Sequence, residues 1–157
     1  MKKLRTLAEL KEIVRLLKEN GKTVVFTNGC FDILHVGHIR CLREAKSLGD
    51  ILIVAVNSDE SIAVNKGLEN LFYPQDERVE ILNAIEYIDY LLLFSDITVD
   101  NILLELKPSI HAKGTDYTVE TVPERATVLS YGGSIAIVGD EKNHSSSLVK
   151  KEIRRSK

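Results

Sequence analysis

Residues 27–38 read Thr-Asn-Gly-Cys-Phe-Asp-Ile-Leu-His-Val-Gly-His, and they begin at the end of a short apolar run that predicts a strand over Thr23–Thr27. The residues that follow, Val36–Leu48, have the spacing of a helix that ends at a glycine. At a strand-to-helix junction, backbone amides converge and the helix N-terminus adds its positive dipole end. His35 and His38 add two imidazoles there. The segment therefore predicts a site for phosphoryl oxygens.

Strand and helix patterns alternate along the rest of the chain. Further strands are expected at Ile51–Asn57, Tyr90–Phe94, Ser109–Lys113 and Ser134–Val138, and further helices at Leu7–Leu17, Asp76–Tyr87, Thr98–Leu106, Thr121–Ser130 and Leu148–Arg155. This order predicts an α/β fold, a single Rossmann-like domain with a parallel sheet of about five strands and helices on both faces. Residues 1–22 are expected to form an N-terminal helix, and residues 23–157 the catalytic core.

The carboxyl ends of parallel strands meet at one edge of a sheet, where ligands bind. We therefore expect the segments that follow the predicted strands to converge. The least regular stretch, Ala63–Gln75, is expected to be a mobile loop over that edge.

Composition excludes several classes of protein. The chain has 157 residues, with 21 Lys and Arg against 23 Asp and Glu, so it lacks the basic excess of a nucleic-acid-binding protein. Its apolar runs are too short to cross a bilayer, and its first residues lack the apolar segment of a secretory signal. Cys30 and Cys41 do not make a disulfide framework. We expect a cytoplasmic protein that binds neither nucleic acid nor membrane.

The histidine stretch also allows a metal-binding interpretation. The Cys and His residues of 30–41 form a Cys-x4-His-x2-His-x2-Cys series, so a zinc site is an alternative. Phosphate binding explains more of the segment, because Gly29 would let the backbone turn sharply and approach a ligand, and Gly37 would do the same between the imidazoles. We predict no metal site made of protein side chains. Neither GxGxxG nor GxxxxGK[ST] occurs, which leaves dinucleotide oxidoreductases and P-loop NTPases without support.

The chain resembles the nucleotidyltransferases that carry a His-x-Gly-His motif. Within their cytidylyltransferase-like branch it is similar to the adenylyltransferase domain of bacterial ADP-heptose synthases. The His-x-Gly-His element is typical of the superfamily, and the Lys-Gly-x-Asp-Tyr element of the heptose branch. The matching segments are Phe26–His38, Ala45–Asp50, Val54–Asp59, Lys113–Tyr117, Tyr131–Gly133 and Ser145–Ser147.

The resemblance implies transfer of AMP from ATP to a sugar phosphate, D-glycero-β-D-manno-heptose 1-phosphate, giving ADP-heptose and pyrophosphate. It also implies Mg²⁺ with the nucleoside triphosphate, and a homodimer. The attacking phosphate is already ionised at neutral pH, so such a site needs in-line positioning and charge stabilisation rather than a general base.

The resemblance also implies roles for individual residues. It places His35 and His38 at the α- and β-phosphates, Lys46 at the phosphates from the same helix, and Asp32 in a catalytic Phe-Asp pair. By themselves Lys46 would be a solvated helix residue and Asp32 a turn or N-cap residue. The residues expected to bind the nucleotide and its phosphates are Thr27, Asn28, Gly29, Cys30, Phe31, Gly37, Lys113, Gly114, Asp116, Ser145, Ser146 and Ser147, of which the serines would also cap the last helix. Those expected to bind the acceptor are Asn57, Asp59, Lys66 and Arg78.

Two departures from the family pattern leave the substrates open. The heptose branch carries an arginine where this chain has Asn70, and residues 139–144 lack the arginine that precedes the Ser/Thr run in glycerol-3-phosphate cytidylyltransferases. The second departure favours ATP over CTP. A cytidylyltransferase acting on glycerol 3-phosphate or another polyol or sugar phosphate, and a nucleotide-binding domain with weak turnover, stay as alternatives. The sugar-kinase domain fused to many heptose enzymes is not in the sequence, so a stand-alone transferase is expected.

Overall fold

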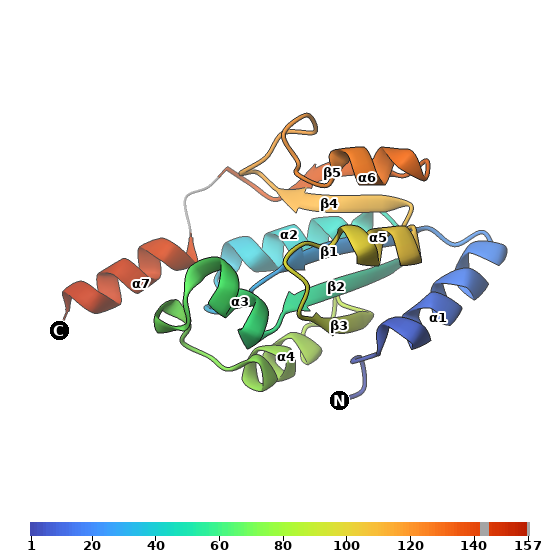
Figure 1. Cartoon of the computed structure of the whole chain (residues 1–157). Coiled ribbons are helices and arrows are strands. Elements are labelled where there is room, and N and C mark those ends of the chain that lie inside the picture. Colours follow the sequence, from blue (N-terminus) through green and yellow to red (C-terminus); the bar gives the residue numbers. More distant parts are fainter. Residues whose placement is uncertain (142–144, 157) are drawn as a thin grey trace.

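A single parallel sheet forms the centre of the molecule in the computed structural model, which describes residues 1–141 and 145–156. The strands lie in the order β3-β2-β1-β4-β5, and each neighbouring pair is parallel (Figure 1). The five strands are β1 (Val24–Gly29), β2 (Ile51–Asn57), β3 (Tyr90–Phe94), β4 (Ile110–Gly114) and β5 (Ser134–Val138). The α/β fold predicted from the sequence is confirmed.

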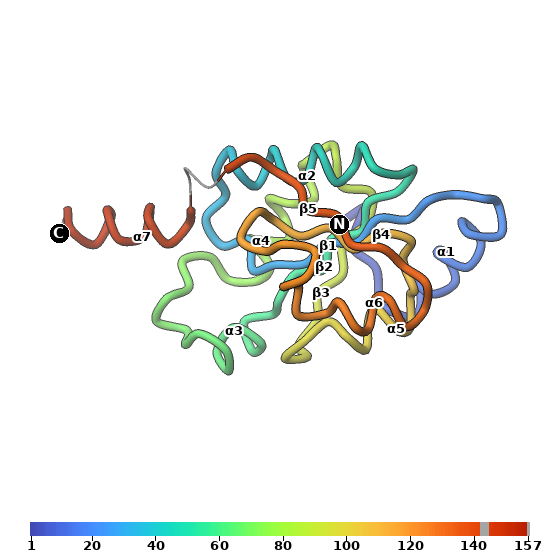
Figure 2. The backbone as a smooth tube through the Cα atoms, turned by 90° about the horizontal axis from the view of Figure 1, so that it is seen from above, coloured from blue at the N-terminus to red at the C-terminus, as the bar shows by residue number. Residues whose placement is uncertain are grey.

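Helices cover both faces of the sheet, as Figure 2 shows from above. One face carries α1 (Leu7–Glu19), α5 (Asp100–Leu106) and α6 (Arg125–Ser130), and the other carries α2 (Val36–Ser47) and α4 (Gln75–Asn83). Three further elements lie toward the carboxyl ends of the strands: α3 (Asp59–Lys66), the 3₁₀ helix η1 (Leu68–Asn70) and α7 (Ser146–Arg155) (Figure 1).

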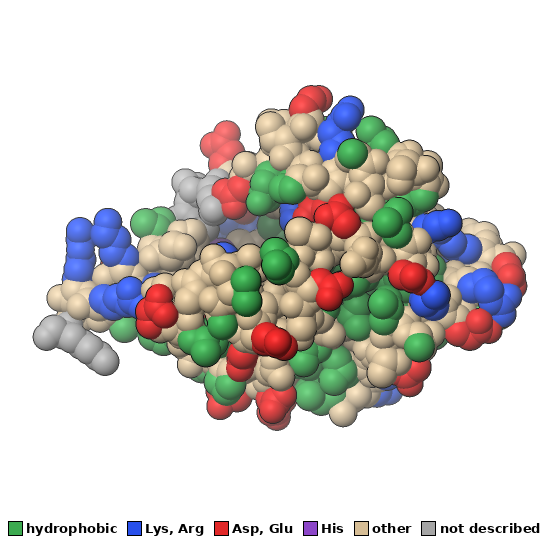
Figure 3. All heavy atoms as spheres, in the orientation of Figure 1, with side chains coloured by type: hydrophobic (Ala, Val, Ile, Leu, Met, Phe, Trp, Pro, Cys, Tyr) green, Lys and Arg blue, Asp and Glu red, His purple; other side chains and the backbone are tan. Residues whose placement is uncertain are grey.

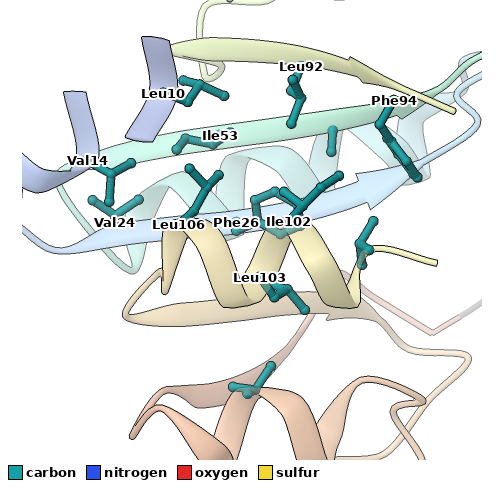
Figure 4. Close-up of a cluster of buried hydrophobic side chains, with 13 residues drawn as sticks. Leu10, Val14, Val24, Phe26, Ile53, Leu92, Phe94, Ile102, Leu103 and Leu106 are labelled. Atoms are coloured by element: carbon teal, nitrogen blue, oxygen red, sulfur yellow. The ribbon is translucent and has the colours of Figure 1, made fainter. Parts of the chain in front are cut away.

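The two hydrophobic cores follow from the alternation of side chains along a strand. In β1, Val24 and Phe26 pack beneath α1 and α5, whereas Val25 packs on the opposite face with residues of α2 and α4. The core under α5 is drawn in Figure 4. Leu52–Val56 of β2 are all buried, as expected of a strand covered on both faces.

One expected loop is partly helical. Residues 63–66 belong to α3, whose first turn is capped by Ser58 through the backbone amide of Ser61. The helix buries just Ser61 and Ile62, so its sequence lacks the apolar periodicity that would have predicted it. The following residues form η1 and an irregular segment up to α4. The expectation of an irregular loop is therefore wrong for its first turn.

In the described part of the chain, no helix is both long enough and apolar enough to span a membrane.

Adjacent leucines of α5 provide a test of the core. Leu103 is fully buried and Leu104 is 46% exposed. Leu103→Ala should lower the free energy of unfolding by ~2–5 kcal/mol, because it leaves a cavity between α5 and the sheet, while Leu104→Ala should change it by less than about 0.5 kcal/mol. Urea denaturation of both variants measures the difference. Equal effects would contradict the placement of α5.

Candidate active site

A cleft of about 1000 Å³ opens at the carboxyl edge of the sheet. The segments that follow all five strands contribute to its lining, which confirms the expected convergence: Cys30, Ile62, Ile97, Thr115 and Asp140 are examples. All the residues predicted for the site line this cleft except Lys46, Asp59 and Arg78.

His35 and His38 are held at the N-terminus of α2 by their own backbone contacts. His35 is the N-cap residue, and its Nδ1 accepts a hydrogen bond from the Gly37 amide at 3.1 Å. The Nδ1 of His38 accepts one from the His35 amide at 3.3 Å. The two ring centroids are 4.0 Å apart. Because both Nδ1 atoms accept, these hydrogen bonds leave Nε2 as the nitrogen that carries a proton in each ring.

The protonation state of His38 suits a hydrogen-bond donor at its Nε2 atom. Burial, together with the charge of His35, lowers the pKa of His38 to about 4. At neutral pH the ring is therefore uncharged, and it can donate a hydrogen bond to a phosphoryl oxygen from Nε2. The positive potential of the cleft must then come from helix N-termini and from lysine and arginine side chains.

The sharp turn after β1 is made by Phe31 and not, as expected, by Gly29. Phe31 has φ of +50°, a left-handed conformation that side chains rarely adopt, whereas Gly29 belongs to β1 and does not have a positive φ. A Cβ atom at Gly29 would lie 3.1 Å from the Phe31 ring. A side chain at position 29 would therefore push that ring by a few tenths of an ångström. The ring centroid of Phe31 also lies 5.6 Å from that of His38.

Asp32 is an anchor between three segments. Its carboxylate accepts hydrogen bonds from the backbone amides of Phe72 and Tyr73 and pairs with Lys150 of α7 at 2.5 Å. Burial by itself raises the pKa of Asp32, but these hydrogen bonds outweigh it and lower the pKa overall. The structure thus gives Asp32 a positioning role at the wall of the cleft, and a direct catalytic role stays a prediction.

The serine run begins α7, as predicted. Ser145 is the N-cap residue and accepts a hydrogen bond from the Leu148 amide, and Ser146 donates one to the Ile33 carbonyl at 2.6 Å. The second contact fixes the start of α7 beside the loop that leads into α2. Ser147 also lines the cleft. Residues 142–144, which belong to the stretch where no arginine was found, lie outside the described residues.

Sequence reasoning missed the cations that α7 brings to the cleft. Lys150 donates to the Asn70 carbonyl at 2.6 Å, and Arg154 donates to the Asn70 side-chain oxygen at 3.1 Å. Figure 3 shows Lys and Arg side chains gathered over this helix. Its cleft-lining cations are Lys150, Lys151, Arg154 and Arg155. The sequence signal was a basic amphipathic helix directly after the serines, but which way its basic face points depends on packing.

Lys46 does not reach the phosphate site, contrary to expectation. It lies in the last turn of α2, eight residues beyond His38, which is ~12 Å along a helix. Its ammonium pairs with Asp89 at 2.6 Å and with the Asp50 carbonyl at 2.5 Å, at the opposite edge of the sheet. Lys46 therefore joins the end of α2 to the residues that lead into β2 and β3.

Arg78 and Asp59 are also placed outside the cleft. Arg78 is fully buried, and its guanidinium donates to the Tyr73 carbonyl, the Cys30 carbonyl and the Asp59 carboxylate at 3.1, 2.5 and 2.8 Å. It joins α4, the turn after β1 and the start of α3. The expected contact with the acceptor is corrected to a structural one, because no face of Arg78 is open to a ligand.

The other residues expected to bind the acceptor do line the cleft. Asn57 lies at the end of β2 and donates to the Ser61 hydroxyl at 2.9 Å, and Lys66 lies at the end of α3 with its ammonium 3.8 Å from the Cys30 thiol. Asn70, which stands where the heptose branch has an arginine, lies beside Arg154. A guanidinium is therefore present near this position, although it comes from another element.

Metal ligands are not clustered in the part of the chain that the structure describes, where no group of three or more His, Cys, Asp or Glu side chains could hold a metal ion. Cys41 instead contacts the Val138 carbonyl, at 3.4 Å. The zinc interpretation of residues 30–41 therefore finds no support in the geometry.

Comparison with known proteins agrees with this geometry. The family model described as Cytidylyltransferase-like matches residues 26–152, a stretch that includes the histidine motif, β1 from Phe26 onward, the other four strands and most of α7. The chain belongs to this family. The family resemblance predicted from the sequence is confirmed.

Relatives in the family include much longer proteins. Bifunctional protein HldE of Geobacter sulfurreducens is 45% identical over 136 residues, and that of Desulfatibacillum aliphaticivorans is 37% identical over 155 residues. These matches cover 87% and 99% of this chain but 28% and 32% of the relatives. The chain thus spans about a third or less of the length of these curated relatives.

Two solved structures resemble the fold. The lipopolysaccharide core biosynthesis protein from Thermoplasma volcanium GSS1 has a TM-score of 0.67 at 27% identity, and the match covers 78% of this chain and 100% of that one. Pantoate-beta-alanine ligase from Francisella tularensis, solved with Beta-gamma ATP and Beta-alanine, has a TM-score of 0.63 at 16% identity and covers 99% and 80%. The second likeness is one of fold alone.

The protonation of His38 can be measured directly. In the ligand-free protein its ring resonance should titrate with a midpoint near pH 4 rather than near 6.5. Between these values the unfolded chain binds a proton at this position that the folded chain does not, so the free energy of unfolding should fall as the pH is lowered through that range. NMR titration measures the midpoint, and His38→Gln assigns the signal. A midpoint near 6.5 would contradict a half-buried ring that is neutral above pH 4.

Proposed function

We propose that this chain is a nucleotidyltransferase that moves AMP from ATP to a sugar phosphate, D-glycero-β-D-manno-heptose 1-phosphate, giving ADP-heptose and pyrophosphate. The observation that carries the proposal is the pair of imidazoles at the N-terminus of α2, in the same cleft as the serines that begin α7, in a chain of the cytidylyltransferase-like family. The heptose acceptor is supported by the sequence resemblance and by likeness to a lipopolysaccharide core biosynthesis protein.

The geometry suits stabilisation of charge on a triphosphate. The Nε2 protons of His35 and His38 would donate to oxygens of the α- and β-phosphates, where negative charge develops during transfer. The amides and hydroxyls at the start of α7 would hold the departing pyrophosphate. In-line displacement then requires the acceptor phosphate on the opposite side of the α-phosphorus. No residue has to remove a proton, because the acceptor oxygen is already ionised.

Mg²⁺ would enter with the triphosphate as part of the substrate. This ion takes oxygen ligands, keeps several waters and is commonly held by substrate phosphates with one or two carboxylates. The described cleft fits that mode, since Asp116 and Asp140 line it but no cluster of three acidic residues is present among the described residues. The protein itself supplies the donors that orient the phosphate oxygens.

Asn70 favours a second candidate for the acceptor. Its side chain bonds to Arg154 and carries no charge of its own, so the contact expected of an arginine in the heptose branch is made differently or not at all. A polyol phosphate or another sugar phosphate is therefore the alternative acceptor.

We also propose a homodimer, on the family resemblance alone. Sedimentation velocity would test this oligomeric state.

A substrate panel tests the reaction. Pyrophosphate release should be fastest with Mg·ATP and D-glycero-β-D-manno-heptose 1-phosphate, and slower with CTP or with glycerol 3-phosphate, since residues 139–144 lack the arginine of the glycerol-phosphate enzymes. Measurement of kcat/KM for each pair decides between the candidates. ATP binding without pyrophosphate release for every acceptor would reject the transferase and favour a nucleotide-binding domain.

Two variants on one helix test the phosphate contacts. His38→Ala should lower kcat by about a hundredfold or more, because loss of one donor to developing charge costs ~3 kcal/mol. Lys46→Met, at the far end of α2, should leave kcat and the KM for ATP unchanged. Steady-state assays with thermal unfolding as a folding control provide the comparison. Wild-type turnover by His38→Ala would refute the assignment.

A further inference from the structure

Residues 113–117, at the end of β4, form one side of the cleft, which we call the β4 wall. A buried polar cluster lies beneath this wall, outside the histidine motif. His111 of β4 is fully buried, and Glu124, directly before α6, is 7% exposed. The Nε2 of His111 lies 3.4 Å from the Glu124 carboxylate, and the other carboxylate oxygen lies 3.8 Å from the Lys113 ammonium. The three side chains thus form a chain of contacts from the core to the cleft.

The backbone explains why these groups meet. Residues two apart in a strand point to the same face, so His111 and Lys113 project together from β4. Glu124 comes from the segment that covers this face and touches both. The ring of His111 lies 5.7 Å from that of Phe26, within the core, and its Nδ1 has no hydrogen-bond partner among the described residues. Its Nε2–H is therefore the donor, and Glu124 the acceptor.

An imidazole in an apolar core is not explained by packing. A leucine would fill such a position without leaving a polar atom unpaired, and a buried carboxylate is costly unless it is paired. Burial raises the pKa of Glu124, but the hydrogen bond from His111 and the charge of Lys113 lower it overall. The carboxylate therefore stays ionised, and its charge acts on the Lys113 ammonium beside it.

The Lys113 ammonium is fixed from several sides. It donates to the Asn28 side-chain oxygen at 3.3 Å, at the end of β1, and lies 5.2 Å from the centre of the Tyr117 ring. Burial lowers the pKa of Lys113, and Glu124 partly offsets this. Lys113, Asn28, Tyr117 and Glu124 all line the cleft. A largely buried ammonium thus lies along the cleft wall at the end of β4.

We propose that His111 and Glu124 are positioning residues that hold the Lys113 ammonium against the nucleoside half of the bound nucleotide. The inference rests on the proposed function. The triphosphate already has donors in His35, His38 and the start of α7, whereas the β4 wall offers an aromatic ring and an ammonium, which suit the acceptor atoms of a ribose or a base. Lys113 makes the contact, and the other two act through it.

Binding measurements separate this role from a phosphate contact. Lys113→Met and Glu124→Gln should each raise the KM and the Kd for ATP ~10-fold or more, the effect of losing a hydrogen bond to a charged group, with little change in kcat. Inorganic tripolyphosphate, which has no nucleoside, should bind both variants as it binds the wild type. Glu120→Gln, an exposed residue of the same loop, is the matched control.

A double-variant cycle tests whether Glu124 acts through Lys113. In the Lys113→Met background, Glu124→Gln should add little further loss of ATP affinity, because the group that it positions is gone. His111→Leu should weaken ATP binding severalfold. Urea denaturation of this variant should show that it still folds. This variant keeps the test valid if Glu124→Gln does not fold.

The outcomes distinguish the two proposals. Equal weakening of ATP and tripolyphosphate, or full additivity in the double variant, would overturn the inference and leave the transferase intact. Variants that bind ATP as the wild type does would do the same. A wild-type protein that binds no ATP and releases no pyrophosphate would overturn the proposed function and this inference together.

Discussion

Parallel pairing of β1 with both of its neighbours brings the histidine motif and the ends of β2 and β4 to one cleft. The register sets Asn28 opposite Ala55 of β2, and Phe26 opposite His111 of β4, so the three strands end close together. In a parallel sheet each strand is followed by a connection at the same edge, and α2 therefore begins there, with its N-terminal residues lining the cleft. Residues far apart in the sequence therefore meet at one cleft.

Carboxylates in this cleft serve mainly to hold cations and loops in place. Asp32 binds two loop amides and Lys150, and Glu124 lies between His111 and Lys113. Each is buried and needs these partners, because an unpaired buried charge is strongly unfavourable. The neutral imidazole of His38 can then act as a hydrogen-bond donor in a cleft whose cations come mostly from α7. This division suits a polyanionic ligand, which needs oriented donors more than it needs a base.

The sequence predicted the fold well, because a continuous apolar strand such as β2 and a capped helix such as α2 are recognisable from a few neighbouring residues. It was less successful where a helix buries little: α3 has just two buried residues and was expected to be partly loop. For the site, the motif residues after β1 were placed correctly at the cleft. Lys46 was not, because a helix carries its side chains away from its N-terminus by a fixed rise per residue. Arg78 was also misjudged, since its complete burial depends on three partners from different segments.

By itself the sequence determined the parallel α/β architecture, the family, and the junction where two histidines cap a helix, because these depend on local spacing and on backbone geometry that neighbouring residues dictate. Only the tertiary structure decided which charged residues face the ligand. Lys150 meets Asp32, and Glu124 meets His111 and Lys113, through contacts between distant segments. Such pairings follow from how helices and loops pack on the sheet, and packing is a property of the whole chain that no short stretch of sequence specifies.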